Sequence, residues 1–266
     1  MNKQLSLILS AAFLAVGLPH AAKAIIIDAQ VSSVTGKAYV LQPGSTARLE
    51  LRPGMTLAPG STVSTETGSV GLQLMPGAVT ILQPSTELAI NRLDYEKKSD
   101  NTVRRSVLLD LKKGSVLSNL QKTGASDFKI KTPYGVAAAR GTTWVVDTTK
   151  TKVYDGVVEV TFTNGRVVRI QAGTFVEATN GGPGVTGPIT QEDFDQIVDA
   201  LKKAGFNVTV ESLPNGGGSK VSIVPPGSDK KFNGTFNPSN LTGGNTSPTE
   251  PSNQTPSPTP TQPPFL

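Results

Sequence analysis

The chain has 266 residues, a formal net charge of +5, one histidine and no cysteine. The lack of cysteine excludes disulfides and a lipid-modified cysteine, and the one histidine, His20, falls in the leader described below. Without His or Cys elsewhere, Ser-His-Asp and Cys-His catalysis and zinc sites built on these residues are excluded. A metal would need oxygen ligands, and we expect no cofactor. With only 5% aromatic residues and scattered basic pairs, we also expect no nucleic-acid binding.

The first 24 residues have the pattern of a secretory signal peptide. A short basic start at Met1–Lys3 precedes an apolar stretch, Leu5 to Leu18, and Ala22-Lys23-Ala24 fits the small-x-small cleavage pattern. We predict cleavage after Ala24, which leaves 242 of the 266 residues and a net charge of +3, because Lys3 and Lys23 are lost. We therefore expect a periplasmic or secreted protein without a transmembrane helix in the mature chain.

Residues 25–179 predict an all-β domain, either an irregular stacked-strand sandwich or a β-helix-like domain. Short segments rich in Val, Ile, Leu and Thr alternate with polar residues, which is typical of strands with one face on a core and one in water. Pro-Gly pairs mark turns between them. The clearest segments are Gly36–Val40, Val70–Leu74, Ser106–Leu111 and Val157–Phe162.

A hairpin is the most specific local prediction in this region. Val158–Phe162 and Arg166–Ile170 flank Asn164-Gly165, a pair that supplies the positive φ values of a tight turn. A weaker signal is that three strand-like segments each begin with a glycine at unequal spacing, which fits similar strands stacked irregularly and no strict repeat. These glycines are Gly36, Gly114 and Gly156.

The composition changes after residue 179. Residues 180–188 are rich in Gly and Pro and predict a linker. Residues 189–225 predict a small helix plus a β-hairpin that docks on the β domain. Thr190 caps this helix with Asp193, and one apolar stripe lies at helical spacing. The stripe consists of Phe194, Ile197, Val198 and Leu201.

Residues 226–266 are rich in Pro, Ser, Thr and Asn and predict a disordered tail, since they cannot bury enough apolar surface to offset the entropy of ordering. Two interpretations stay open: a spacer or glycosylated stalk, and a tail without a function of its own. The tail has no apolar segment that would anchor it in a membrane.

Three ordered segments resemble the FecR domain, over roughly Val31 to Thr179. They are Gly54-Met-Thr-Leu-Ala-Pro-Gly-Ser-Thr-Val-Ser-Thr65, Gly68-Ser-Val-Gly-Leu-Gln-Leu-Met-Pro-Gly-Ala-Val-Thr80 and Phe128-Lys-Ile-Lys-Thr-Pro-Tyr-Gly-Val-Ala-Ala-Ala-Arg-Gly-Thr-Thr-Trp144. Gly156-Val-Val-Glu-Val160 and Ala172-Gly173 follow in the same order.

The resemblance implies an all-β, periplasmic or secreted bacterial domain without enzymatic activity. The best-known members pass a signal from a ferric-siderophore receptor to a cytoplasmic sigma factor through a transmembrane helix. This chain departs from that plan, because we expect neither a mature transmembrane helix nor a cytoplasmic segment. An iron-receptor signalling partner is therefore less expected than an envelope protein or a surface polymer.

The stretch from Thr132 to Val146 holds the candidate site. It contains the only tryptophan, Trp144, and places Arg140 among small and apolar residues. One interpretation is a fold-defining corner between strands, in which Arg140 bonds turn carbonyls. The residues of this motif are Thr132, Pro133, Gly135, Arg140, Gly141 and Thr142. The other is that Arg140 and Trp144 form a small anion or cation–π site.

We predict a non-enzymatic FecR-like protein for binding, sensing or cell-envelope assembly. Two alternatives are a secreted polysaccharide-active hydrolase with an Asp/Glu pair and a structural extracellular matrix protein. Nothing in the spacing of the carboxylates pairs them for the first. The candidates are Asp94, Glu96, Asp110, Asp127, Asp147 and Asp155.

Overall fold

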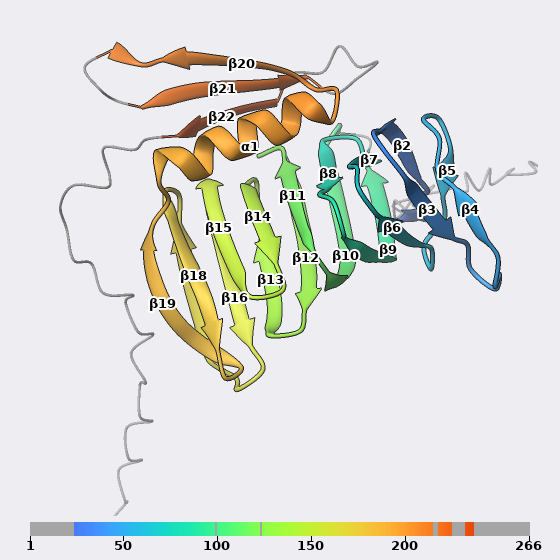
Figure 1. The fold of residues 1–266 in the computed structure, drawn as a ribbon, viewed down its shortest axis with the longest axis horizontal. Helices are drawn as coiled ribbons and strands as arrows, with labels where there is room; N and C mark the ends of the chain where they lie inside the picture. The colour runs from blue at the N-terminus through green and yellow to red at the C-terminus, as the bar shows by residue number, and fades with distance from the viewer. Residues whose placement is uncertain (1–23, 99, 123, 215–217, 225–231, 237–266) are drawn as a thin grey trace, which may run out of the picture.

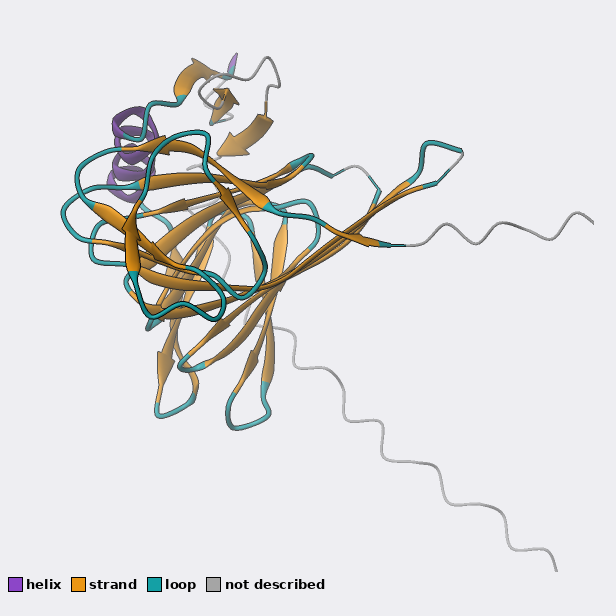
Figure 2. Ribbon diagram, turned by 90° about the vertical axis from the view of Figure 1, so that its right-hand side faces the viewer, coloured by secondary structure: helices purple, strands orange, loops and turns teal. Residues whose placement is uncertain are grey.

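The computed structural model describes residues 24–98, 100–122, 124–214, 218–224 and 232–236. The predicted signal peptide, apart from Ala24, and most of the predicted tail lie outside the described residues. Within these residues the chain builds a 10-stranded and a 9-stranded sheet, which face each other, and a smaller 3-stranded sheet. Figures 1 and 2 show the two large layers, with one helix and the small sheet beside them. The fold is all-β, as predicted, and takes the form of a two-sheet sandwich.

Sheet A is the 10-stranded sheet, and its strands are antiparallel except for the parallel neighbours β10 and β12. In spatial order they are β17 (Val167–Gln171), β16 (Val157–Phe162), β13 (Gly135–Ala139), β12 (Ala125–Thr132), β10 (Val103–Lys113), β9 (Glu87–Lys97), β6 (Thr62–Thr65), β3 (Ala38–Leu41) and β4 (Arg48–Glu50), with β1 (Ile25–Ile26) paired to β9.

Sheet B is the 9-stranded sheet. In spatial order its strands are β19 (Gly182–Pro188), β18 (Thr174–Thr179), β15 (Lys150–Asp155), β14 (Thr143–Asp147), β11 (Ser115–Leu120), β8 (Ala78–Leu82), β7 (Val70–Met75), β2 (Ala29–Val34) and β5 (Thr56–Leu57). The chain passes repeatedly from one sheet to the other, so that β12 and β13 of sheet A precede β14 and β15 of sheet B. Gly36, Gly114 and Gly156 lie at such crossings with φ of 65°, 82° and 84°, which accounts for their repeated place before strands.

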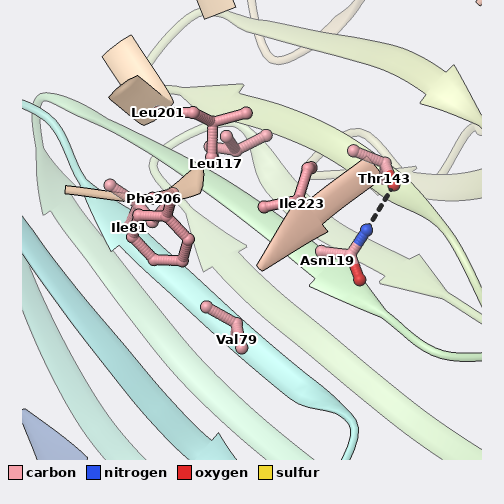
Figure 3. Close-up of a pocket in the computed structure, with 8 residues that line it drawn as sticks. All are labelled: Val79, Ile81, Leu117, Asn119, Thr143, Leu201, Phe206 and Ile223. Carbon is pink, nitrogen blue, oxygen red and sulfur yellow. Dashed lines mark hydrogen bonds between the residues drawn. The ribbon is translucent and has the colours of Figure 1, made fainter. Parts of the chain in front are cut away.

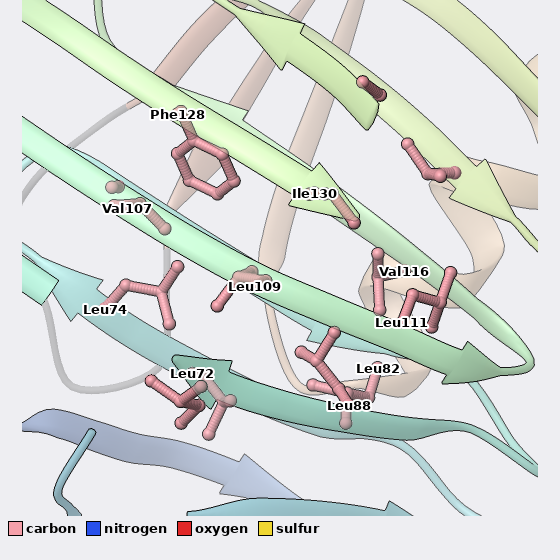
Figure 4. Packing of buried hydrophobic residues seen from close by; sticks show 14 of the residues in the cluster. Leu72, Leu74, Leu82, Leu88, Val107, Leu109, Leu111, Val116, Phe128 and Ile130 are labelled. Carbon is pink, nitrogen blue, oxygen red and sulfur yellow. The ribbon is translucent and has the colours of Figure 1, made fainter. Parts of the chain in front are cut away.

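The main core fills the space between the two sheets (Figure 4). Along β12, Phe128 and Ile130 point inward and are buried, whereas Lys129 and Lys131 between and after them point outward. The same alternation on the other strands gives each sheet one apolar inner face. Burying a single Leu, Ile or Phe side chain stabilises the fold by about 1.5–3 kcal/mol, so this layer holds the sandwich together.

The predicted hairpin is confirmed as β16 and β17, which pair Val158 with Ile170. The Gly165 amide donates to the Phe162 carbonyl over 2.9 Å, and Gly165 has a φ of 84°, which suits glycine.

The small unit, which consists of the helix and the 3-stranded sheet, lies on the outer face of sheet B. Helix α1 (Gln191–Lys203) begins at the predicted cap, where Thr190 and Asp193 form a capping box. Its apolar stripe joins β21 (Ser219–Val224) and sheet B in a second buried cluster. Figure 1 shows α1 lying across the strands of sheet B. Within the described residues α1 is the only α-helix, and no helix is long and apolar enough to cross a membrane.

Two predicted boundaries differ from the structure. The predicted linker, residues 180–188, contains β19, which pairs with β18. Its Gly and Pro residues are not typical of a strand, so the sequence does not indicate one here. An edge strand pairs through main-chain hydrogen bonds on one side only and therefore tolerates proline. The predicted hairpin is a three-stranded sheet, in which β20 (Asn207–Ser212), β21 and β22 (Phe232–Phe236) are antiparallel neighbours. β22 lies inside the predicted tail, where the polar composition gave no strand signal.

Candidate binding surface

Arg140 and Trp144 do not form a shared site. Trp144 lies on β14, points into the core and is fully buried, with its ring centroid 4.9 Å from that of Phe128 in an edge-to-face contact. Arg140 follows β13 of the opposite sheet and is exposed, and it makes no hydrogen bond or ion pair with any residue that the structure describes. The structure thus gives Trp144 a packing role and does not show Arg140 bonded to turn carbonyls.

The other residues of the motif build a corner. The chain leaves sheet A after β13 and enters sheet B at β14, so residues 140–142 form the crossing. Thr142 is buried, and its Oγ1 donates to the Val157 carbonyl over 3.1 Å. Gly141 has a φ of 68°, and a Cβ there would lie 2.8 Å from the Lys122 Cα. The crossing is therefore closed by Thr142 and requires glycine before it.

The turn between β12 and β13 is closed in a similar way. Thr132 Oγ1 donates to the Gly135 carbonyl over 3.1 Å, whereas Pro133 is exposed. A Cβ at Gly135 would meet the Thr161 carbonyl oxygen at 2.2 Å, so β16 approaches too closely for any other residue. Between them the Tyr134 hydroxyl bonds Thr151 Oγ1 of sheet B at 2.7 Å, and burial raises the pKa of Tyr134 above its ordinary range.

A cavity of ≈ 10 Å³ lies between the outer face of sheet B and the small unit (Figure 3), about the space that one water needs. Its lining is mostly apolar and consists of Val79, Ile81, Leu117, Asn119, Thr143, Leu201, Phe206 and Ile223. This cavity is a packing defect between docked layers, too small for a substrate.

Five of the six candidate carboxylates, all except Glu96, make structural contacts that the structure records. Asp110 contacts Lys112 and Lys131, and Asp155 contacts Lys122. Asp147 accepts the backbone amides of residues 149 and 150 in a turn. Among the described residues no group of three or more His, Cys, Asp or Glu side chains could hold a metal ion. These contacts give Asp110, Asp147 and Asp155 structural partners in the part of the chain that the structure describes.

The open surface of the sandwich is the outer face of sheet A. We define it by the outward residues of β9, β10, β12, β13, β16 and β17, which are Arg92, Asp94, Glu96, Arg104, Ser106, Leu108, Asp110, Asp127, Lys129, Lys131, Val136, Ala138, Val157, Glu159, Thr161, Val167, Arg169 and Gln171, together with Arg140. The second buried cluster includes no residue of these strands. Among the described residues, the small unit therefore covers sheet B and leaves this face open.

Charges on this face pair along and across the strands. Lys129 contacts Asp127 at 3.0 Å, Arg169 contacts Glu159 at 3.1 Å, and both pairs are largely exposed. The strand register places Ala138 between Lys129 and Glu159, in the middle of the face. Exposed pairs of this kind contribute about 0–1 kcal/mol each, so their charges can exchange partners at low cost.

The position of Arg105 is not evident from the sequence, because adjacent basic residues usually lie at the surface. Its side chain is buried, and its Nε donates to the Pro76 carbonyl over 2.7 Å. Burial lowers the pKa of Arg105. A signal was present, since Arg105, Val107 and Leu109 share the inward face of β10.

The comparison with known families identifies the sandwich. Residues 61–168 match the FecR protein family. The chain carries a FecR domain. The matched residues run from the loop before β6 into β17 and contain the crossing at residues 140–142. The corner residues thus lie inside the FecR domain, as does most of the outer face of sheet A.

Other comparisons add distant likenesses. None of the curated proteins matches the chain. Two crystal structures of a candidate anti-sigma factor from Parabacteroides distasonis ATCC 8503 are similar to it. The first has 18% identity and a TM-score of 0.40 and covers 57% of this chain and 68% of that chain. The second has 16% identity and a TM-score of 0.38 and covers 54% of this chain and 73% of that chain.

Proposed function

We propose that this protein is a non-enzymatic, exported binding module whose FecR domain presents the outer face of sheet A to another protein of the cell envelope. The FecR family supports a regulatory or signalling role. The predicted signal peptide supports the location outside the cytoplasm.

The proposal rests on one difference between the two outer faces of the sandwich: one is apolar and covered, and the other is charged. The outer face of sheet B is apolar at Val79, Ile81 and Leu117 and is covered by the chain's own small unit. The outer face of sheet A has charged residues of both signs and no such cover from any residue that the structure describes. Mixed charge fits a protein of complementary pattern better than a uniformly anionic polymer, since each sign needs an opposite partner.

Site-specific photocrosslinking tests the proposal. A photoreactive residue at Ala138, in the middle of the outer face of sheet A, should capture one discrete protein in the cells that produce the chain. The control position is Lys202, which is exposed on α1 and should not capture that protein. No crosslink at position 138, or the same product from both positions, would count against the proposal. A crosslink to polysaccharide alone would indicate that the partner is a polymer and not a protein.

The absence of turnover is tested separately. The purified protein should release no sugar from any envelope or extracellular glycan. A hydrolytic activity that one substitution removes, such as Asp110→Asn, would show that the protein is an enzyme.

A further inference from the structure

Strand β1 gives sheet A a short strand edge with two exposed apolar side chains. β1 pairs with the end of β9, Ile25 with Tyr95 and Ile26 with Asp94, and its other edge is open within the described residues. Both side chains are large, apolar and exposed, at 56% for Ile25 and 75% for Ile26. β9 and β10 are both 11 residues long, and Figure 2 shows long strands that extend beyond the rest of the sandwich.

The other outermost strands of the two large sheets differ from β1. Natural proteins protect edges with proline, charged side chains or very short strands. β19 contains Pro183 and Pro188, and β17 carries the exposed Arg169. β4 has two charged residues among its three, and β5 is two residues long with a buried leucine. β1 is as short as β5, but it has no proline or charged residue and both of its side chains are exposed and apolar, which favours pairing with another strand.

The hydrogen bonds of β1 show which groups are free. The Ile27 amide donates to the Leu93 carbonyl over 3.1 Å, so residue 27 faces β9. Since successive residues of a strand face opposite sides, the N–H and C=O of Ile26 point away from β9. A second strand can accept and donate at this one residue.

We propose that β1 pairs with β1 of a second copy of this chain across a two-fold axis at Ile26. In such an antiparallel pair, the two Ile26 residues exchange both main-chain hydrogen bonds, and each Ile25 lies opposite the partner's Ile27. The two exposed Ile26 side chains then cover each other. Sheet A becomes continuous through both copies.

Charge complementarity favours a second copy over an unrelated strand. In this register Asp28, which is exposed, lies opposite position 24 of the partner. With cleavage after Ala24, as proposed above, the new α-amino group of Ile25 carries a positive charge beside that aspartate. An isologous contact of this type closes on itself and gives a dimer rather than a fibre. Because each copy contributes only the two-residue strand β1 to the contact, we expect a dissociation constant on the order of 100 µM.

Sedimentation equilibrium of the purified exported protein tests the proposal, with its N-terminus read by mass spectrometry. A retained leader would be seen there. It would count against the export proposal and would remove the charge contact with Asp28, whereas the strand pairing at Ile26 is tested by the variants themselves. The wild type should form a reversible dimer. Ile26→Pro removes the outward N–H and the exposed isoleucine side chain. It should weaken the dimer at least about tenfold without lowering the melting temperature, since the main-chain bonds to β9 come from its neighbours.

A matched pair of lysine variants provides the control. Ile26→Lys should abolish the dimer, whereas Val185→Lys, at an exposed valine of edge strand β19 (65% exposed), should leave it unchanged. A monomer at about 1 mM, well above the expected constant, would overturn the proposal. A dimer that both Ile26 variants leave intact would overturn it as well.

The lack of cysteine allows a direct test of the two-fold axis. Cα atoms of a hydrogen-bonded antiparallel pair lie about 5.5 Å apart, within disulfide range. Ile26→Cys should therefore form a disulfide-linked dimer under mild oxidation at low concentration, and Val185→Cys should not. Crosslinking of position 26 to a different protein, with no homodimer, would show that the edge serves another partner.

Discussion

The crossing between β13 and β14 allows Arg140 and Thr142 to be compared as stabilising residues. Arg140 is exposed and has no hydrogen bond or ion pair among the described residues, so Arg140→Ala should change the free energy of unfolding by less than about 0.5 kcal/mol. Thr142→Val keeps the side-chain shape but leaves the Val157 carbonyl without its 3.1 Å hydrogen bond. Loss of this part-buried hydrogen bond costs about 0.5–1.5 kcal/mol. Gly141→Ala should cost at least as much, because of its φ of 68° and the 2.8 Å approach to Lys122.

Urea denaturation measures these differences. The only tryptophan, Trp144, is fully buried two residues after Thr142, so its fluorescence reports on this corner directly. The midpoint should fall for Thr142→Val and Gly141→Ala and stay unchanged for Arg140→Ala, with equal slopes. If Arg140→Ala were as destabilising as Thr142→Val, Arg140 would be the residue that fixes the corner and the reasoning would be refuted.

Two further predictions concern the small unit and Arg105. Burial would raise the pKa of Asp193, but its bonds from Lys152 and Thr190 hold it below the ordinary value. Asp193→Ala should therefore cost about 1–2 kcal/mol above the unfolded pKa of about 3.9, and the difference from wild type should vanish as pH falls through the lower folded pKa. Thermal denaturation from pH 2 to 8 checks this, and a constant difference would contradict it. Arg105→Ala should lower the melting temperature, whereas Arg104→Ala, at the exposed neighbour, should leave it within about 2 °C; equal effects would contradict the buried position of Arg105.

Much of the fold follows from the strand alternation. The hairpin at Asn164-Gly165 and the helix from Thr190 were predictable because each depends on contacts within a few residues. β19 and β22 were not, because their residues are held by main-chain pairing with strands whose positions the sequence does not show. The alternation along β10 indicates an inward position for Arg105. Arginine usually lies at the surface of proteins, so residue type alone does not predict its burial.

The candidate site was only partly predictable. The order Thr-Pro-x-Gly and Arg-Gly-Thr indicated a corner, and the structure places Thr132, Gly135, Gly141 and Thr142 in contacts that close it. The opposite directions of Arg140 and Trp144 could not be predicted, because they depend on the chain changing sheets between them. Nor does the sequence show that the small unit covers only one of the two outer faces.

The central claim is that the outer face of sheet A binds a protein partner. The most direct measurement is the affinity of the captured partner for wild type and for two matched lysine reversals, by isothermal titration calorimetry. Lys129→Glu, on the outer face of sheet A, should weaken binding by at least about tenfold, and Lys202→Glu, on α1, by less than about twofold. Equal affinity of all three proteins would contradict the account.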